Sequence, residues 1–255
     1  MAIIANGFKR ALKEKRLQIG LWQVLANAHT AEICATMGFD WLLFDSEHAP
    51  NDVPRLQAQL QAVAAYPVHP VARVPIGETW IVKQYLDTGV QTILVPLVDT
   101  AEQARALVKA MRYAPEGVRG VGSSGARASR WSAHGDYVEW ANAEVCLLVQ
   151  AETRQALDNL DAIADVEGVD GIFIGPNDLA ASLGHRGKMD HPDVQRAIGH
   201  AMERIAKAGK AGGILSGNDA DARRYIDAGF LFVAVGSDAG LLARSGRELA
   251  ARYKA

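Results

Sequence analysis

A short unit recurs along this chain of 255 residues: a helical pattern ends in glycine, and a short apolar segment follows. The glycines are Gly38, Gly89, Gly168, Gly209 and Gly229, and the segments after them are rich in Val, Ile, Leu and Phe. Glycine is favoured just beyond a helix because that position often takes a left-handed backbone. Continuous apolar runs are typical of parallel strands that are buried on both faces. The unit therefore predicts strands and helices that alternate around one core.

Eight such strands are expected, in the ranges 20–24, 41–45, 70–74, 92–98, 144–152, 171–175, 211–215 and 230–236. Alternating strands and helices predict a parallel sheet, and eight strands in roughly 250 residues favour a closed (β/α)8 TIM barrel. Since no linker or shift in composition divides the chain, we expect residues 1–255 to form a single domain. One long connection, 112–143, interrupts the alternation of strands and helices, and long loops of this kind are often functional.

Composition excludes several classes of function. The formal net charge is −2 and the Lys and Arg residues are spread along the chain, so no basic patch for nucleic acid is expected. No apolar run approaches the roughly 18 residues of a membrane span, and the N-terminus lacks a signal-peptide pattern. Cys34 and Cys146 lie in apolar runs and are expected to pack as small core residues rather than form a disulfide. We expect a cytoplasmic protein without membrane or nucleic-acid partners.

Polar residues gather where the strands are expected to end, and that end of a (β/α)8 barrel carries the active site. They are Trp22 in the first strand, Asp45, Ser46, Glu47 and His48 after the second, Arg73 in the third, Gln150 and Glu152 in the fifth, and Asn177 and Asp178 after the sixth. Their coincidence on one rim predicts a site.

Each of these residues also has a structural explanation. Asp178 could cap the next helix, Arg73 could form an ion pair with Asp45 or Glu47, His48 could be a hydrogen-bonded loop residue, and Trp22 could be a packing residue. Two other side chains are harder to explain in this way. Gln150 and Glu152 point to the same face of one strand, and an unpaired carboxylate inside the barrel would be costly.

If Glu152 and Asp178 converge, their carboxylates suit Mg²⁺ or Mn²⁺ and leave coordination positions open for a 2-oxo acid. The metal would act as a Lewis acid for chemistry at the carbon beside the ketone. Arg73 could hold charge on the same oxygen, and His48 could carry a proton near neutral pH. Asp45, three residues earlier, could fix the tautomer of His48. The lysines lie mainly in helical or loop patterns, which argues against a Schiff-base route.

The stretches FDSEHAPND, PVARVP, RYAPEGVRGVGSSGARASRW, LVQAET and GPNDLAASLG resemble the HpcH/HpaI family of class II pyruvate aldolases. The resemblance implies a divalent cofactor (Mg²⁺, Mn²⁺ or Co²⁺) and substrates that are a small 2-oxo acid, pyruvate or hydroxypyruvate, and an aldehyde. It implies metal ligands at Glu152 and Asp178, catalytic residues at His48, Arg73, Asp45 and Asp87, and substrate contacts at Gln150, Gly175, Pro176, Asn177, Trp22 and Leu215. Asp87 would be linked to the Asp45–His48 pair.

The resemblance also implies a homo-oligomer, a hexamer built as a trimer of dimers. In such an assembly the C-terminal helix is exchanged between subunits, and the loop holding Ser123, Ser124 and Arg127 approaches a neighbouring subunit's site. The chain departs from the family pattern at Asn177, at Ala180 and at 123–125, which leaves donor and acceptor preference open. Two alternatives remain from the sequence: a citrate-lyase-like enzyme acting on a CoA thioester, and a non-catalytic barrel that binds 2-oxo acids.

Overall fold

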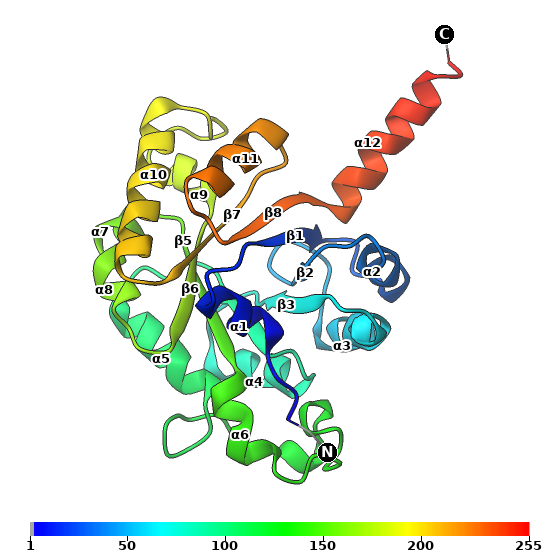
Figure 1. Cartoon of the computed structure of the whole chain (residues 1–255), viewed down its shortest axis with the longest axis vertical. Coiled ribbons are helices and arrows are strands. Elements are labelled where there is room, and N and C mark those ends of the chain that lie inside the picture. The colour runs from blue at the N-terminus through cyan, green and yellow to red at the C-terminus, as the bar shows by residue number, and fades with distance from the viewer. Residues whose placement is uncertain (1–2, 255) are drawn as a thin grey trace.

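The structure, a computed structural model, describes residues 3–254 and contains a closed barrel of parallel strands (Figure 1). The eight strands pair in chain order, and the last pairs with the first. They are β1 (Gln18–Gln23), β2 (Trp41–Asp45), β3 (His69–Arg73), β4 (Thr92–Val95), β5 (Cys146–Ala151), β6 (Val169–Ile174), β7 (Ala211–Leu215) and β8 (Phe232–Ser237). The expected (β/α)8 barrel is confirmed.

Helices surround the barrel, and the predicted glycines end five of the helical segments between strands. All five of these glycines have a positive φ, from 75° at Gly209 to 96° at Gly168 and Gly229, as a helix-ending glycine requires. The helices are α1 (Gly7–Lys13), α2 (Ala28–Ala35), α3 (Val53–Ala62), α4 (Thr79–Asp87), α5 (Ala101–Met111), α6 (Tyr137–Glu144), α7 (Arg154–Asp158), α8 (Leu160–Ala164), α9 (Pro176–Ser182), α10 (Pro192–Lys207), α11 (Asp219–Asp227) and α12 (Asp238–Ala251).

The barrel interior is filled by aromatic side chains that meet glycines on neighbouring strands. A Cβ atom at Gly20 would lie 2.1 Å from the Trp41 ring, and one at Gly213 would lie 2.0 Å from the Phe232 ring. These glycines are therefore needed for space. The aromatic cluster comprises Phe8, Trp22, Trp41, Phe173 and Phe232. Because these rings fill the barrel, the functional space is left above them, at the strand ends.

Two strands, β4 and β5, are clearly shorter than the sequence predicts. β4 ends at Val95 because Pro96 has no N–H to donate to a neighbouring strand and Leu97 takes a positive φ of 54°. β5 begins only at Cys146 because α6 continues through Glu144. Both cysteines are buried and free, as expected.

The last helix, α12, extends away from the barrel, as the red helix in Figure 1 shows. Beyond its first residue it has no buried side chain among the described residues, and Leu242 and Leu249 are 66% and 54% exposed. Its exchange between subunits stays a prediction. Within residues 3–254, none of the helices combines the length and the apolar character that crossing a bilayer needs.

Candidate active site

A cavity of about 470 Å³ opens at the carboxyl ends of the strands. Nine of the twelve side chains or backbone positions predicted for the site line it: Trp22, His48, Arg73, Gln150, Gly175, Pro176, Asn177, Asp178 and Leu215. Asp45 and Glu152 lie directly behind this lining, each bonded to one of its members. Eleven of the twelve residues therefore lie together at one end of the barrel, while their roles stay predictions.

Arg73 is the most firmly held of the lining side chains. Its Nε and one terminal nitrogen donate to the two oxygens of Asp45 at 2.9 and 2.6 Å. Its other terminal nitrogen lies 2.7 Å from a carboxylate oxygen of Glu47. The guanidinium also stacks over Trp22, 5.1 Å from the ring centroid. Because three neighbours fix its plane, Arg73 presents its remaining N–H groups to the cavity in one orientation.

The carboxylate of Asp45 binds the Arg73 guanidinium and not the His48 ring, so the expected link to that ring is not formed. Besides Arg73, its carboxylate accepts from Trp22 Nε1 at 3.2 Å and from the backbone amides of Glu47 and His48 at 2.9 and 3.3 Å. Burial alone would raise the pKa of Asp45, but the hydrogen bonds and charge of Arg73, together with the two amides, hold it below its usual value. Asp45 therefore stays ionised and orients the Arg73 guanidinium rather than the His48 imidazole.

His48 stands at the mouth of the cavity, where its side chain is 68% exposed. Its nearest carboxylate is Glu47, whose oxygen lies 3.7 Å from His48 Nε2. The sequence placed Glu47 on the rim as a possible ion-pair partner of Arg73, which the structure shows, but gave it no role in the chemistry of the site. Its carboxylate lies close to the Arg73 guanidinium and to the His48 imidazole, so Glu47 stands between these two side chains.

Glu152 is a buried carboxylate just past the end of β5. One oxygen accepts from the Leu97 amide at 2.9 Å, and the other accepts from the Gln150 side chain. Gly175 passes so close that a Cβ there would lie 2.3 Å from the same Glu152 oxygen. Burial, with smaller contributions from the charges of Asp178 and Glu47, raises the pKa of Glu152 to about 7, against the hydrogen bonds from Gln150 and Leu97.

These residues fit a divalent cation. Asp178 is not the cap of α9, because Gly175 occupies that position and no side-chain cap bond is formed there. Its carboxylate instead faces the cavity and raises the pKa of both Glu47 and Glu152. Three mutually repelling carboxylates of this kind are stabilised by a hard cation with oxygen ligands. The buried Oε1 of Gln150 also has no hydrogen-bond partner among the described residues, so it too is available to a bound group.

Asp87 lies at the other end of the barrel in this chain. It is the last residue of α4, and its carboxylate accepts from Arg119 at 2.8 Å. The expected link between Asp87 and the Asp45–His48 pair is therefore not formed within one chain. The long connection lies at this same end, because Arg127 donates to the carbonyl oxygen of Thr88 at 2.7 Å. Neither segment lines the cavity, and their roles in a neighbouring subunit stay predictions.

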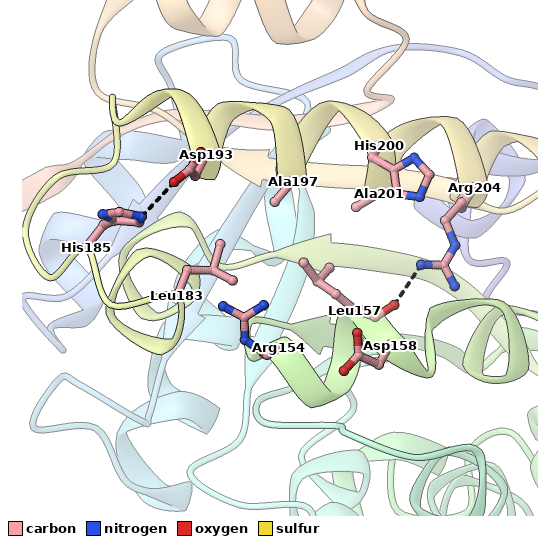
Figure 2. Close-up of a pocket in the computed structure, with 10 residues that line it drawn as sticks. All are labelled: Arg154, Leu157, Asp158, Leu183, His185, Asp193, Ala197, His200, Ala201 and Arg204. Atoms are coloured by element: carbon pink, nitrogen blue, oxygen red, sulfur yellow. Dashed lines mark hydrogen bonds and ion pairs between the residues drawn. The ribbon is translucent and has the colours of Figure 1, made fainter.

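A second hollow of about 460 Å³ lies outside the barrel, between α10, α7 and the segment that follows α9 (Figure 2). At its edge His185, His191 and Asp193 bring possible metal-ligand atoms within 4.8 Å of one another. The two imidazole rings are stacked, 3.6 Å apart and inclined by 16°, so their in-plane lone pairs run nearly parallel. The backbone amide of Asp193 also donates to His191 Nδ1. This arrangement suits a helix cap better than a metal site.

Comparison with known proteins agrees with this geometry. The family model described as HpcH/HpaI aldolase/citrate lyase matches residues 18–245. The chain is 63% identical to a hydroxypyruvate/pyruvate aldolase of Deinococcus radiodurans over 251 residues, which cover 98% of this chain and 91% of that protein. It is 56% identical to a 4-hydroxy-2-oxo-heptane-1,7-dioate aldolase of Klebsiella pneumoniae, over 97% of this chain and 94% of that protein.

A solved structure from Burkholderia cenocepacia, of an HpcH/HpaI aldolase/citrate lyase family protein, superimposes with a TM-score of 0.95. It is 39% identical and covers 98% of this chain and 100% of its own. Fold and sequence thus agree, and the chain belongs to the HpcH/HpaI aldolase/citrate lyase family.

Proposed function

We propose that this protein is a divalent-metal-dependent aldolase, a carbon–carbon lyase that reversibly cleaves 4-hydroxy-2-oxo acids to pyruvate or hydroxypyruvate and an aldehyde. The observation that carries the proposal is the buried Glu152 carboxylate, whose pKa the nearby charge of Asp178 helps to raise, behind the lining of a cavity that Asp178 and the rigidly held Arg73 share. A buried carboxylate is costly unless an opposite charge pairs with it, and a bound cation would supply that charge. The high identity to named aldolases supports the same reaction.

Glu152 and Asp178 would hold Mg²⁺, Mn²⁺ or Co²⁺, which supplies Lewis acidity toward the oxygens of a 2-oxo acid. Arg73 directs its free N–H groups toward the ketone oxygen and stabilises the negative charge that develops there when the carbon–carbon bond breaks. Gln150 binds the pyruvate end of the substrate. The backbone at Gly175 and Pro176, together with Asn177, surrounds the donor carboxylate.

His48 carries the proton between the acceptor oxygen and solvent, directly or through a water molecule. Its exposed position at the cavity mouth gives it access to both. Glu47, at 3.7 Å, stabilises the imidazolium that forms when His48 takes the proton. Trp22 and Leu215 form the apolar part of the wall near the aldehyde.

A homo-oligomer, in the form of a trimer of dimers, is part of this proposal. α12 leaves Leu242 and Leu249 exposed, and the long connection leaves Val121 and Trp131 exposed by 66% and 59%. Apolar side chains of this size on projecting segments are commonly covered in an assembly. A single domain spanning 1–255 and a cytoplasmic location, in keeping with two free cysteines, complete the proposal.

The proposal is tested by aldol addition and cleavage with pyruvate and hydroxypyruvate under defined metal. We expect activity to vanish after exhaustive chelation and to return with Mn²⁺, Mg²⁺ or Co²⁺. Glu152→Gln should abolish metal-dependent turnover. Arg73→Lys keeps the charge but loses the fixed fork, and should lower turnover by about 10²–10³-fold. Glu203→Gln, on the exposed face of α10, is the matched control.

Three results would contradict the proposal. Activity that survives chelation would exclude the metal. A fully active Arg73→Lys enzyme would exclude a role for the fixed guanidinium fork of Arg73. Cleavage of malyl-CoA without any aldol reaction would favour the CoA-thioester alternative over the aldolase.

A further inference from the structure

The outer half of the cavity has a different chemical character from the inner half. It is lined by residues of the 187–190 loop and by the segment from Leu215 into α11. Two carboxylates, Asp190 and Asp221, stand on this wall with the polar side chains of Ser216 and Asn218. Among the described residues that line the cavity, no Lys is present and Arg73 is the one Arg.

This outer wall is held in place by Gln195 of α10. Its side-chain amide donates to the carbonyl oxygen of Met189 at 2.6 Å, next to Asp190. Its oxygen accepts from the Tyr225 hydroxyl at 3.1 Å and from Arg224 at 2.7 Å, both on α11. Gln195 thus joins the loop to α11, so the two carboxylates face the same space in a defined arrangement.

Some polar groups of this wall have no hydrogen-bond or ion-pair partner among the described residues. Asp190 makes no ion pair or side-chain hydrogen bond within residues 3–254, whereas Asp221 lies 2.9 Å from Arg224 on the outside of the wall. The side-chain oxygen of Asn218 accepts from the Asp221 amide at 3.0 Å, which leaves its NH₂ group available. The wall therefore offers a free acceptor at Asp190 and a free donor at Asn218, which together match a hydroxyl group.

We propose that this wall selects the aldehyde: the acceptor is an uncharged, hydroxylated aldehyde, and aldehydes that carry a carboxylate are disfavoured. The inference rests on the proposed aldolase function and adds the substrate class of its acceptor. A carboxylate on the aldehyde would approach Asp190 and Asp221, whereas the one Arg among the described lining residues, Arg73, is already paired with Asp45 and Glu47, and like charges at close range cost affinity. A hydroxyl group, in contrast, can donate to Asp190 and accept from Asn218.

The test compares matched aldehydes with saturating pyruvate and Mn²⁺, with kcat/KM for the aldehyde as the readout. 4-Oxobutanoate and its methyl ester differ in charge, and we expect the wild type to prefer the ester by about tenfold or more, because the unpaired Asp190 carboxylate, with a smaller contribution from Asp221, repels the anion. Asp190→Asn should reduce this preference by about threefold. Asp221→Asn should reduce it less, because Arg224 already neutralises that side chain. Asp158→Asn, an exposed acid outside the cavity, should leave the ratio unchanged.

A second pair tests the hydroxyl groups. We expect glyceraldehyde to be preferred over propanal, and Asn218→Ala to reduce this preference by about fivefold, the effect of one hydrogen bond. Equal or better use of 4-oxobutanoate by the wild type, or an unchanged ester-to-acid ratio in Asp190→Asn, would overturn the inference while leaving the aldolase intact. Failure to add or release any aldehyde would overturn the proposed function and this inference with it.

Discussion

Gly175 provides the sharpest test of the proposed metal site, because the three atoms nearest to an added Cβ belong to Glu152 and to its hydrogen-bond partner Gln150. Its φ and ψ of −87° and 95° are open to any residue, so Gly175→Ala brings no backbone strain. The new methyl group would lie 2.3 Å from an oxygen of Glu152 and 2.9 Å from its Cβ. Ordinary contact begins at 3.4 Å, so the Glu152 carboxylate must retreat by about 1 Å.

That displacement has a predictable magnitude. Glu152 is held by the Leu97 amide on one oxygen and by Gln150 on the other, so it cannot move without loosening both bonds. Loss of such supporting contacts lowers metal affinity by about 10–100-fold. A shift of about 1 Å in a catalytic group lowers turnover by about 100-fold. The unfolding free energy should fall by about 1–3 kcal/mol, as in other overpacked sites.

Metal affinity can be measured by calorimetry with Mn²⁺ and by titrating activity with the metal, beside a thermal melt of each protein. Gly199→Ala is the matched control, since a Cβ at Gly199 meets nothing within 4 Å and the residue lies within α10. It should keep wild-type activity and gain about 0.5–1 kcal/mol of stability. Wild-type metal affinity and turnover in a folded Gly175→Ala protein would refute the assignment of Glu152 as a ligand.

Three further predictions concern stability. Asp87→Asn should lower the unfolding free energy in urea by about 1–2 kcal/mol, because it leaves the fully buried Arg119 side chain without its counter-ion; unchanged stability with lost turnover would instead indicate a catalytic Asp87. Burial lowers the pKa of His69 from 6.5, so the unfolded chain takes up the proton first and stability should fall as the pH drops below 6.5. His69→Gln should flatten that decline and the exposed-residue control His200→Gln should not; a wild-type slope in His69→Gln would contradict this. Gly213→Ala should lose about 1–3 kcal/mol in the same urea assay, because its methyl group would enter a packed aromatic interior, and an undiminished midpoint would show that the interior can yield.

The barrel could be predicted because its signals are local. A helix-ending glycine and a continuous apolar run lie within a few residues of each other, and each carries its own physical reason. The strand ends could not be predicted as well. The backbone turns away from β4 at Leu97, whose amide donates a hydrogen bond to Glu152, 55 residues later in the chain. A pattern of neighbouring residues cannot predict a contact over that separation.

Asp45 shows the same limit inside the site. Its place three residues before His48 suggested that its carboxylate would bind the His48 imidazole. The pairing of β2 with β3 instead determines which side chain it binds. In the register of β2 and β3, Asp45 lies opposite Arg73, so the carboxylate and the guanidinium meet across the sheet. Sequence proximity predicted which residues gather at the rim, whereas register decided which of them touch.

Asp87 and the long connection raise a different point, because their place follows from the polarity of the fold. α4 runs back from the carboxyl end of β3, so its last residue, Asp87, must lie at the amino end of β4, far from the cavity. Arg127 is held at that same end by Thr88. A catalytic role for Asp87 therefore requires a second copy of the chain to bring this end of its barrel against the cavity mouth. The predicted role and the predicted oligomer consequently depend on each other, and an active monomer in solution would exclude both.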